Sequence, residues 1–465
     1  MQVMPSLVFD NMIKGRMKKT PANTIDSTAN LGGTKSSRTV AVRTLMAVTL
    51  KSRPFDIALD EMTREAKLDP RDRAFAFNLV MLSLRQLGAL RYVMGALLDR
   101  GLPRNATWTE AALVTGLAQI LFMRTADHAA VNETVDMIKA LDGKEKGFAG
   151  LVNAILRSAI RKRDAILKDL SGAPERNLPQ WLRESWTSSY GKPAMQAIAA
   201  TLATNPPLDI SLKPGENADA WAKTLEGTLL PTGSIRRTAT EVMALEGYGD
   251  GAWWIQDVAA AIPATLLGDV SGKLVLDLCA APGGKTMQLA AGGASVIAVD
   301  RSKNRMGRLK ANLKRTGLSA EVVIDNAAAY TPTAPADHIL VDAPCSATGT
   351  LRRNPDVLWT KTSDDVAKLA NLQTAILAHA FELLPVGGTL VYCVCSLEKS
   401  EGPDQITRFL GTTENAKRVP ITDKDVGGMS ELVTLAGDLL CLPSHYDHAG
   451  GMDGFYAARI TKVKI

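Results

Sequence analysis

Three short motifs in the C-terminal half combine residues that could bind a cofactor and form a covalent bond. The first, Asp277–Thr286, reads DLCAAPGGKT and joins a carboxylate, two glycines and a lysine. The second, Asp342–Gly349 (DAPCSATG), offers a carboxylate and a thiol, and the third, Cys393–Ser396 (CVCS), offers two thiols. A thiolate is a strong nucleophile, and a carboxylate can hold or donate a proton. The motifs therefore favour covalent catalysis beside a ligand-binding turn.

Short apolar runs lead into these motifs and are separated by helical stretches. Most of the runs end in an acid, and the last leads into two cysteines. Strands that alternate with helices predict a parallel sheet covered on both faces, and such sheets bind ligands at the carboxyl ends of their strands. Gly454–Arg459 is expected to form a late antiparallel strand. The predicted strands are 274–277, 296–300, 322–325, 339–342 and 390–395.

The turn in the first motif indicates the kind of ligand. Gly283 and Gly284 let the backbone approach a ligand closely at the start of a helix. The spacing matches neither a P-loop nor the dinucleotide fingerprint. Asp300 ends the next strand, where a carboxylate can accept hydrogen bonds from ribose hydroxyls. The pattern favours a nucleoside-bearing cofactor without a pyrophosphate grip, and the alternative is an ordinary strand–helix turn.

The five cysteines divide by position. Cys279, Cys393 and Cys441 are interpreted as small buried apolar residues, whereas Cys345 and Cys395 follow strand ends and favour chemistry. A zinc site is the rival interpretation. It is disfavoured because there is no C-x-x-C pair and histidine is scarce, at five residues. We therefore expect no metal.

Composition limits the class of protein. A chain of 465 residues predicts two to four domains, and a net charge of +6 permits a polyanionic partner. The chain has no apolar run of the about 18 residues that a membrane span needs, and its cysteines do not form a disulfide framework. We expect a cytoplasmic monomer. The predicted divisions are a basic arm (1–36), a helical domain (37–170), a connecting subdomain (171–250) and an α/β domain (251–465).

The helical domain is predicted from apolar residues at helix spacing. The basic arm is predicted from its composition. Leu113, Leu117 and Leu121 are one such set. Residues 1–36 are basic, poor in acids and without an apolar period, so a disordered arm, a start codon placed too early and an organellar transit peptide all stay open. In 171–250, Trp181 and Trp186 are expected to anchor a small core.

The motifs, in this order, resemble the S-adenosylmethionine-dependent RNA cytosine-C5 methyltransferases. The helical half is similar to the antitermination factor NusB through Asp72–Phe75, Val131–Val135 and Leu151–Arg157. That fusion is characteristic of the bacterial RsmB (Sun/Fmu) family, which acts on 16S ribosomal RNA. The resemblance implies an all-α NusB-like RNA-binding domain followed by a Rossmann-like class I methyltransferase domain with a mostly parallel sheet.

The resemblance also implies roles for individual residues. Cys395 is the nucleophile that adds to C6 of cytosine, and Cys345 helps to remove the C5 proton and release the product. Asp342 is the candidate proton or hydrogen-bond donor at N3, and Lys285 orients the base. S-adenosyl-L-methionine is the implied cofactor. The residues expected to bind it are Cys279, Ala280, Ala281, Pro282, Gly283, Gly284, Lys285, Asp300, Arg305, Asp325 and Asp342.

The chain departs from the family pattern in one stretch, and rival functions stay open. Val394 stands where the family usually has Thr, and Ser400–Gly402 replaces Glu-Glu-Asn, keeping Glu401. Arg352, Arg353 and the cluster 161–163 could contact RNA phosphates or could be solvated loop and helix ends. The rivals are a non-catalytic RNA-binding or antitermination module, a methyltransferase acting on tRNA or large-subunit rRNA, and a nicotinamide dehydrogenase.

Overall fold

The computed structural model describes residues 36–238 and 241–465, and the chain divides into two compact units. One contains the chain up to Gln180 together with Leu358–Thr360, and the other contains the remainder. The prediction of a basic N-terminal arm falls almost entirely on residues 1–35, outside the described part. Within the described ranges, no helix is both long enough and apolar enough to cross a membrane.

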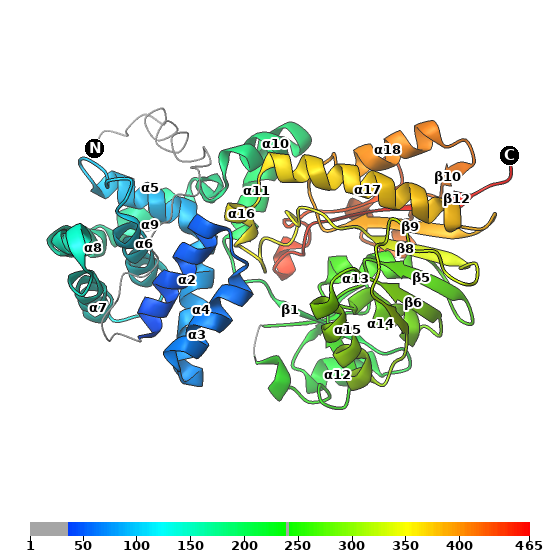
Figure 1. Ribbon diagram of the computed structural model, residues 1–465, viewed down its shortest axis with the longest axis horizontal. Coiled ribbons are helices and arrows are strands. Elements are labelled where there is room, and N and C mark those ends of the chain that lie inside the picture. The colour runs from blue at the N-terminus through cyan, green and yellow to red at the C-terminus, as the bar shows by residue number, and fades with distance from the viewer. Residues whose placement is uncertain (1–35, 239–240) are drawn as a thin grey trace. The chain divides into compact units, whose positions relative to one another are not determined.

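The first unit is helical (Figure 1). Its core is built from residues at helix spacing, and Leu113 and Leu117 of the central helix are fully buried, as the sequence predicts. Asp69 caps a helix by accepting a hydrogen bond from the Asp72 N–H (2.8 Å), with Pro70 in the first turn. The helices are α2 (Ser37–Lys51), α3 (Phe55–Ala66), α4 (Pro70–Arg85), α5 (Leu87–Leu97), α6 (Thr107–Phe122), α7 (Asp127–Lys139), η1 (Gly143–Phe148), α8 (Ala149–Arg161), α9 (Arg163–Ser171) and η2 (Pro174–Asn177), with α16 (Val357–Thr360) contributed from later in the chain.

The second unit is built on a mostly parallel sheet with the order β10-β12-β9-β8-β5-β6-β7, in which β11 also pairs with β12. The strands β5 to β9 run parallel, and β12 lies antiparallel to β9. The predicted α/β fold and its late antiparallel strand are confirmed. The strands are β5 (Leu274–Leu278), β6 (Ser295–Val299), β7 (Glu321–Val323), β8 (His338–Asp342), β9 (Thr389–Val394), β10 (Ala416–Arg418), β11 (Leu439–Cys441) and β12 (Phe455–Lys462).

Helices cover both faces of this sheet, as Figure 1 shows. On one face, Val275, Leu340 and Val391 pack against α13 and α14. On the other, Leu276 and Ile339, which are the neighbouring residues on their strands, pack against α17. Both faces are therefore apolar, which explains why these strands read as continuous apolar runs. The helices are α13 (Val258–Thr265), α14 (Gly284–Ala291), α15 (Lys303–Thr316), α17 (Ser363–Leu383) and α18 (Pro403–Thr412), with short η4 (Asp423–Val426), η5 (Ser430–Leu432) and η6 (Asp447–Ala449).

A small antiparallel sheet with the order β2-β3-β1-β4 precedes the large one and was not predicted. Its strands are too short to show a period of two. Trp186 is fully buried, as expected of an anchor, whereas Trp181 is half-buried. The elements of this part are α10 (Gln180–Tyr190), α11 (Lys192–Leu202), β1 (Leu208–Leu212), α12 (Ala218–Thr224), β2 (Thr228–Leu229), β3 (Ile235–Arg237), η3 (Val242–Ala244) and β4 (Trp253–Ile255).

Candidate active site

The three motifs meet at one edge of the large sheet. They follow β5, β8 and β9, which are adjacent strands, and Asp342 at the end of β8 pairs in register with Cys393 of β9. Because the strands are parallel, their carboxyl ends lie at the same edge. The turns that carry Lys285, Cys345 and Cys395 therefore open on a common site.

The two thiols expected to carry chemistry are in contact. Cys345 Sγ lies 3.4 Å from Cys395 Sγ, and both side chains are half-buried. The hydrogen bond to Cys395, together with burial, raises the pKa of the Cys345 thiol well above its ordinary value. Either thiol can be the donor in the hydrogen bond that joins the two sulfurs.

A buried ammonium and a carboxylate lie beside the thiols. Lys285 Nζ, in the first turn of α14, is 2.9 Å from Asp342 Oδ2 and lies 4.7 Å from the centre of the Phe455 ring. Burial acts to lower the pKa of Lys285, but the negative charge of Asp342 outweighs it, so the pKa lies above its ordinary value. Cys393 donates a hydrogen bond to the other oxygen of Asp342 (3.6 Å). The site thus holds a fixed positive charge.

The turn after β5 brings the backbone close to the sheet edge. Cys279 and Gly283 adopt left-handed conformations, with φ of 64° and 106°. A Cβ atom on Gly283 would lie 2.9 Å from Leu309 Cγ, so the turn packs tightly on α15. Ala280 N–H donates to Val299 O (3.0 Å), which fastens the turn to β6. Pro282 completes the turn before α14 begins at Gly284. The small residues predicted to bind the cofactor are consecutive in this turn, and Ala280, Ala281 and Gly283 are buried in it.

Acids stand at the ends of the next strands. Asp300, after β6, is buried and accepts hydrogen bonds from the N–H groups of Ser302 (2.8 Å) and Ala281 (3.3 Å). Arg305 lies 3.6 Å from Asp300 Oδ2 and also donates to the carbonyl oxygen of Ala281. Asp325, after β7, is exposed. Asp300 and Arg305 therefore hold the turn after β5 in place through the backbone of Ala281.

Asp277 begins the first motif, but no role in catalysis or cofactor binding is predicted for it from the sequence. It is fully buried beneath the turn, where Thr286 Oγ1 donates to its Oδ2 (2.6 Å), and its Oδ1 has no hydrogen-bond partner in the described part of the chain. Burial raises the pKa of Asp277 to about 7. An acid in the middle of an apolar strand, at the sequence LVLDL, was the signal that could have found it.

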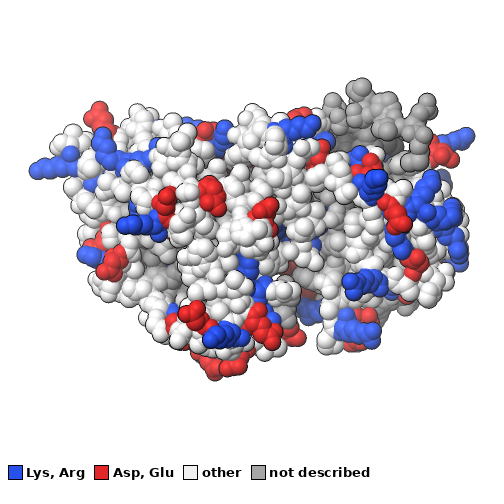
Figure 2. Space-filling view, turned by 180° about the vertical axis from the view of Figure 1, so that it is seen from behind, with Lys and Arg blue, Asp and Glu red and all other residues white. Residues whose placement is uncertain are grey.

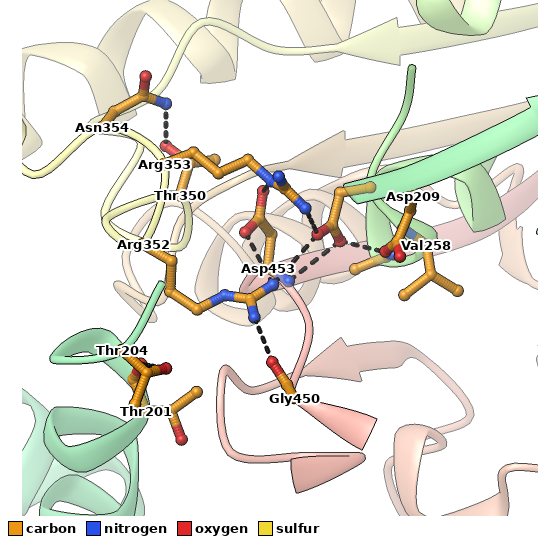
Figure 3. A network of polar contacts seen from close by, with 12 residues as sticks. Thr201, Thr204, Asp209, Val258, Thr350, Arg352, Arg353, Asn354, Gly450 and Asp453 are labelled. Atoms are coloured by element: carbon orange, nitrogen blue, oxygen red, sulfur yellow. Dashed lines mark hydrogen bonds and ion pairs between the residues drawn. The ribbon is translucent and has the colours of Figure 1, made fainter. Parts of the chain in front are cut away.

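The two arginines after the second motif have a structural role, and this corrects an expectation (Figure 3). Arg352 has no exposed surface and pairs with Asp257 and Asp453, both at 3.2 Å. Arg353 lies 2.8 Å from Asp257, the N-cap of α13. Phosphate contact and a solvated loop end are both wrong for Arg352, because its charge is neutralised inside the fold.

The basic cluster in the helical unit is differently placed. Arg161 and Lys162 are exposed, whereas Arg163 pairs with Asp127. Figure 2 shows Lys and Arg side chains gathering toward the right of the view, over the helical unit. Arg161 and Lys162 are thus accessible to a polyanion.

The helical unit and the α/β unit with its sheet-edge site match two families, and together they place the protein in a class of methyltransferases that modify ribosomal RNA. The family model described as 16S rRNA methyltransferase RsmB/F matches residues 264–461, and the NusB family model matches residues 35–161. The chain belongs to the family of ribosomal RNA small subunit methyltransferase B, as shown by its similarity to curated members. It is 34% identical to the protein of that name from Cronobacter sakazakii, covering 82% of this chain and 91% of the relative.

Further comparisons agree. The Pseudomonas syringae pv. tomato protein of the same name is 32% identical, covering 92% of this chain and 97% of the relative. Among solved structures, PH0851 aligns with a TM-score of 0.68 at 22% identity, covering 91% of this chain and 98% of that one. NSun6 from Pyrococcus horikoshii aligns with a TM-score of 0.52 at 19% identity, covering 62% of this chain and 99% of that one. The two solved structures support the fold alone.

Proposed function

We propose that this protein transfers a methyl group from S-adenosyl-L-methionine to C5 of a cytosine in small-subunit 16S ribosomal RNA, through a covalent adduct. The observation that carries the proposal is the contact between Cys345 and Cys395 beside the Lys285–Asp342 pair. The substrate rests on the names of the curated relatives.

The turn after β5 suits this cofactor. Its left-handed Gly283 lets the turn pack against Leu309 of α15, the following helix start offers backbone N–H groups, and Asp300 and Asp325 follow the next two strands. When bound there, S-adenosylmethionine supplies an electrophilic methyl group on a sulfonium. We assign the methionine portion to the Gly283–Gly284 turn, the ribose to Asp300 and the adenine side to Asp325.

The chemistry follows from the poor nucleophilicity of C5. The thiolate of Cys395 adds to C6, which breaks the aromaticity of the ring and makes C5 enamine-like. Asp342 acts here as the protonated acid, positioned by Lys285: it takes up a proton before the attack and passes it to N3, which neutralises the adduct. C5 then takes the methyl group.

Elimination restores the enzyme. The C5 proton passes to the sulfur of Cys345, which gives its own proton to the departing sulfur of Cys395. The C5–C6 double bond forms again and the bond between C6 and Cys395 breaks. The sulfur of Cys345 is in contact with that of Cys395, so it is well placed for this second half of the reaction. The target base must be turned out of its stack to reach the site.

The testing experiment is methyl transfer from labelled S-adenosylmethionine to unmodified 16S rRNA, followed by nucleoside analysis. We expect labelled 5-methylcytidine. Label in tRNA or large-subunit rRNA instead would overturn the substrate assignment and keep the chemistry. Folded protein that methylates no RNA would favour the non-catalytic RNA-binding module.

A further inference from the structure

Glu401 lies in the loop after β9 and has no exposed surface. Its Oε1 accepts a hydrogen bond from the backbone N–H of Ser346 (2.9 Å), and its Oε2 accepts from the hydroxyl groups of Ser346 and Ser396, both at 2.5 Å. A buried carboxylate satisfied by several short donors is held rigidly. Glu401 therefore joins two loops that come from different strands.

The residues that Glu401 binds are the immediate neighbours of the two thiols. Ser346 follows Cys345 in the loop after β8, and Ser396 follows Cys395 after β9. The two serine hydroxyl groups also lie 3.1 Å apart. One carboxylate thus holds two Cys-Ser pairs side by side.

Glu401 is itself fixed from two further directions. The hydroxyl of Tyr392 donates to the carbonyl oxygen of Glu401 (2.6 Å). The amide of Gln373, on α17, donates to Glu401 Oε1 (3.1 Å) and to the carbonyl oxygen of Pro344 (2.9 Å), the residue before Cys345. Hydrogen bonds from strand β9 and helix α17 therefore hold Glu401 in place. We call Glu401 with its bonded Ser346 and Ser396 the clamp.

We propose that Glu401 is a positioning residue that holds Cys345 and Cys395 in contact by binding the serine that follows each. This inference rests on the proposed function for its catalytic consequence. Glu401 reaches neither sulfur by a hydrogen bond itself, and acts through Ser346 and Ser396. Its negative charge also contributes to the raised pKa of Cys345, after the hydrogen bond to Cys395 and burial.

Glu398 provides a matched control, because it is a second buried carboxylate in the same loop. It accepts hydrogen bonds from Ser185 (2.5 Å) and from the indole of Trp186 (2.8 Å) on α10, and it also bonds to Thr348. Its carboxylate binds neither Ser346 nor Ser396, the two serines that Glu401 holds. Substitution of Glu398 therefore measures the effect on activity of weakening the loop's attachment to α10 while the hydrogen bonds from Ser346 and Ser396 to Glu401 stay in place.

The test compares Glu401→Gln and Glu401→Ala with Glu398→Gln in the full-length protein. With unmodified 16S rRNA, we expect the Glu401 variants to lose about 100-fold in kcat, with little change in the KM for S-adenosylmethionine. Glu398→Gln should stay within about threefold of wild type. If Glu401→Ala does not fold, Ser346→Ala and Ser396→Ala take its place. Each should lower kcat, and combining Ser346→Ala with Glu401→Gln should add little, because the two act through one contact.

A second readout does not depend on activity. Alkylation by iodoacetamide, followed peptide by peptide across pH, should show Cys345 reacting at lower pH in Glu401→Gln than in wild type or Glu398→Gln. An unchanged Cys345 profile with unchanged kcat would overturn the inference, as would equal losses in Glu398→Gln and Glu401→Gln. If wild type methylates no RNA, the proposed function fails, and the alkylation profiles still decide the role of Glu401.

Discussion

The ammonium group of Lys285 lies 2.9 Å from the carboxylate of Asp342, and the pair stands at the sheet edge where the thiols of Cys345 and Cys395 meet. The two residues are 57 positions apart and come from a helix start and a strand end. Only 9% of the Lys285 side chain is exposed, so its positive charge is poorly screened by water. The charge acts on Asp342, Cys393 and Cys395 together.

Lys285→Met should lower kcat by about 100-fold or more, because the carboxylate of Asp342 loses the charge that holds it in place. The same variant should slow alkylation of Cys395 at pH 7, since a thiolate there loses a neighbouring cation. The measurements are single-turnover methyl transfer and peptide-resolved alkylation. Lys285→Arg, which keeps the charge, is the control. Equal activity in Lys285→Met and wild type would contradict the proposed role.

The two cysteines should fail at different steps. Cys395→Ala should abolish methylation and the covalent adduct. Cys345→Ala should methylate once and remain attached to RNA, because the second half of the reaction is blocked. A denaturing gel separates free protein from a slow-migrating adduct. The opposite pattern would exchange the two roles.

Gly283→Ala should weaken cofactor binding and lower the free energy of unfolding by about 1–3 kcal/mol, because φ is 106° and the new Cβ would lie 2.9 Å from Leu309 Cγ. Gly307→Ala is the matched control: it lies in the exposed face of α15 with no atom within 4 Å of a new Cβ, and should not destabilise. Urea unfolding and titration with S-adenosylmethionine measure both quantities. Equal free energies of unfolding and equal affinities for S-adenosylmethionine in the two variants would show that the turn does not require glycine at position 283.

The buried Asp277 should make stability depend on pH. Its pKa is about 7 in the folded protein, above the value of about 3.9 in an unfolded chain, so the folded state binds its proton more tightly. The contribution of this proton to the free energy of unfolding is full below about pH 4. It falls by about 1.4 kcal/mol for each pH unit above that, and it is lost as pH rises through 7. Asp277→Asn cannot ionise and should have a flatter profile. Urea unfolding at pH 5 and pH 7 measures the difference, and identical slopes would contradict it.

Arg352→Met should lower the free energy of unfolding by about 3–5 kcal/mol, because it leaves Asp257 and Asp453 buried with one fewer partner. Arg301→Met, at an exposed position, should change it by less than about 0.5 kcal/mol. Urea unfolding compares the two. A stable Arg352→Met protein that binds RNA less tightly, with a shallower salt dependence, would restore phosphate contact as the role of Arg352.

The sequence by itself determined the helical half, the α/β half and the order of the motifs. Leu113 and Leu117 recur at helix spacing, and the apolar runs before Asp342 and Cys393 read as buried strands, because periodicity and burial of whole strands are local properties. The short strands of the sheet β2-β3-β1-β4 escaped prediction since two to five residues are too few to show a period.

The tertiary structure alone decided which side chains meet. Cys345 and Cys395 are 50 residues apart, Ser346 and Glu401 are 55, and Asp257 and Arg352 are 95. Neither the contact between the two thiols nor the binding of Glu401 to the neighbouring serines follows from spacing along the chain. Arg352 looks like a surface cation in the sequence and is fully buried in the fold. Burial and partnership of a charge depend on what the rest of the chain packs against it, and this is set only when distant strands and loops come together.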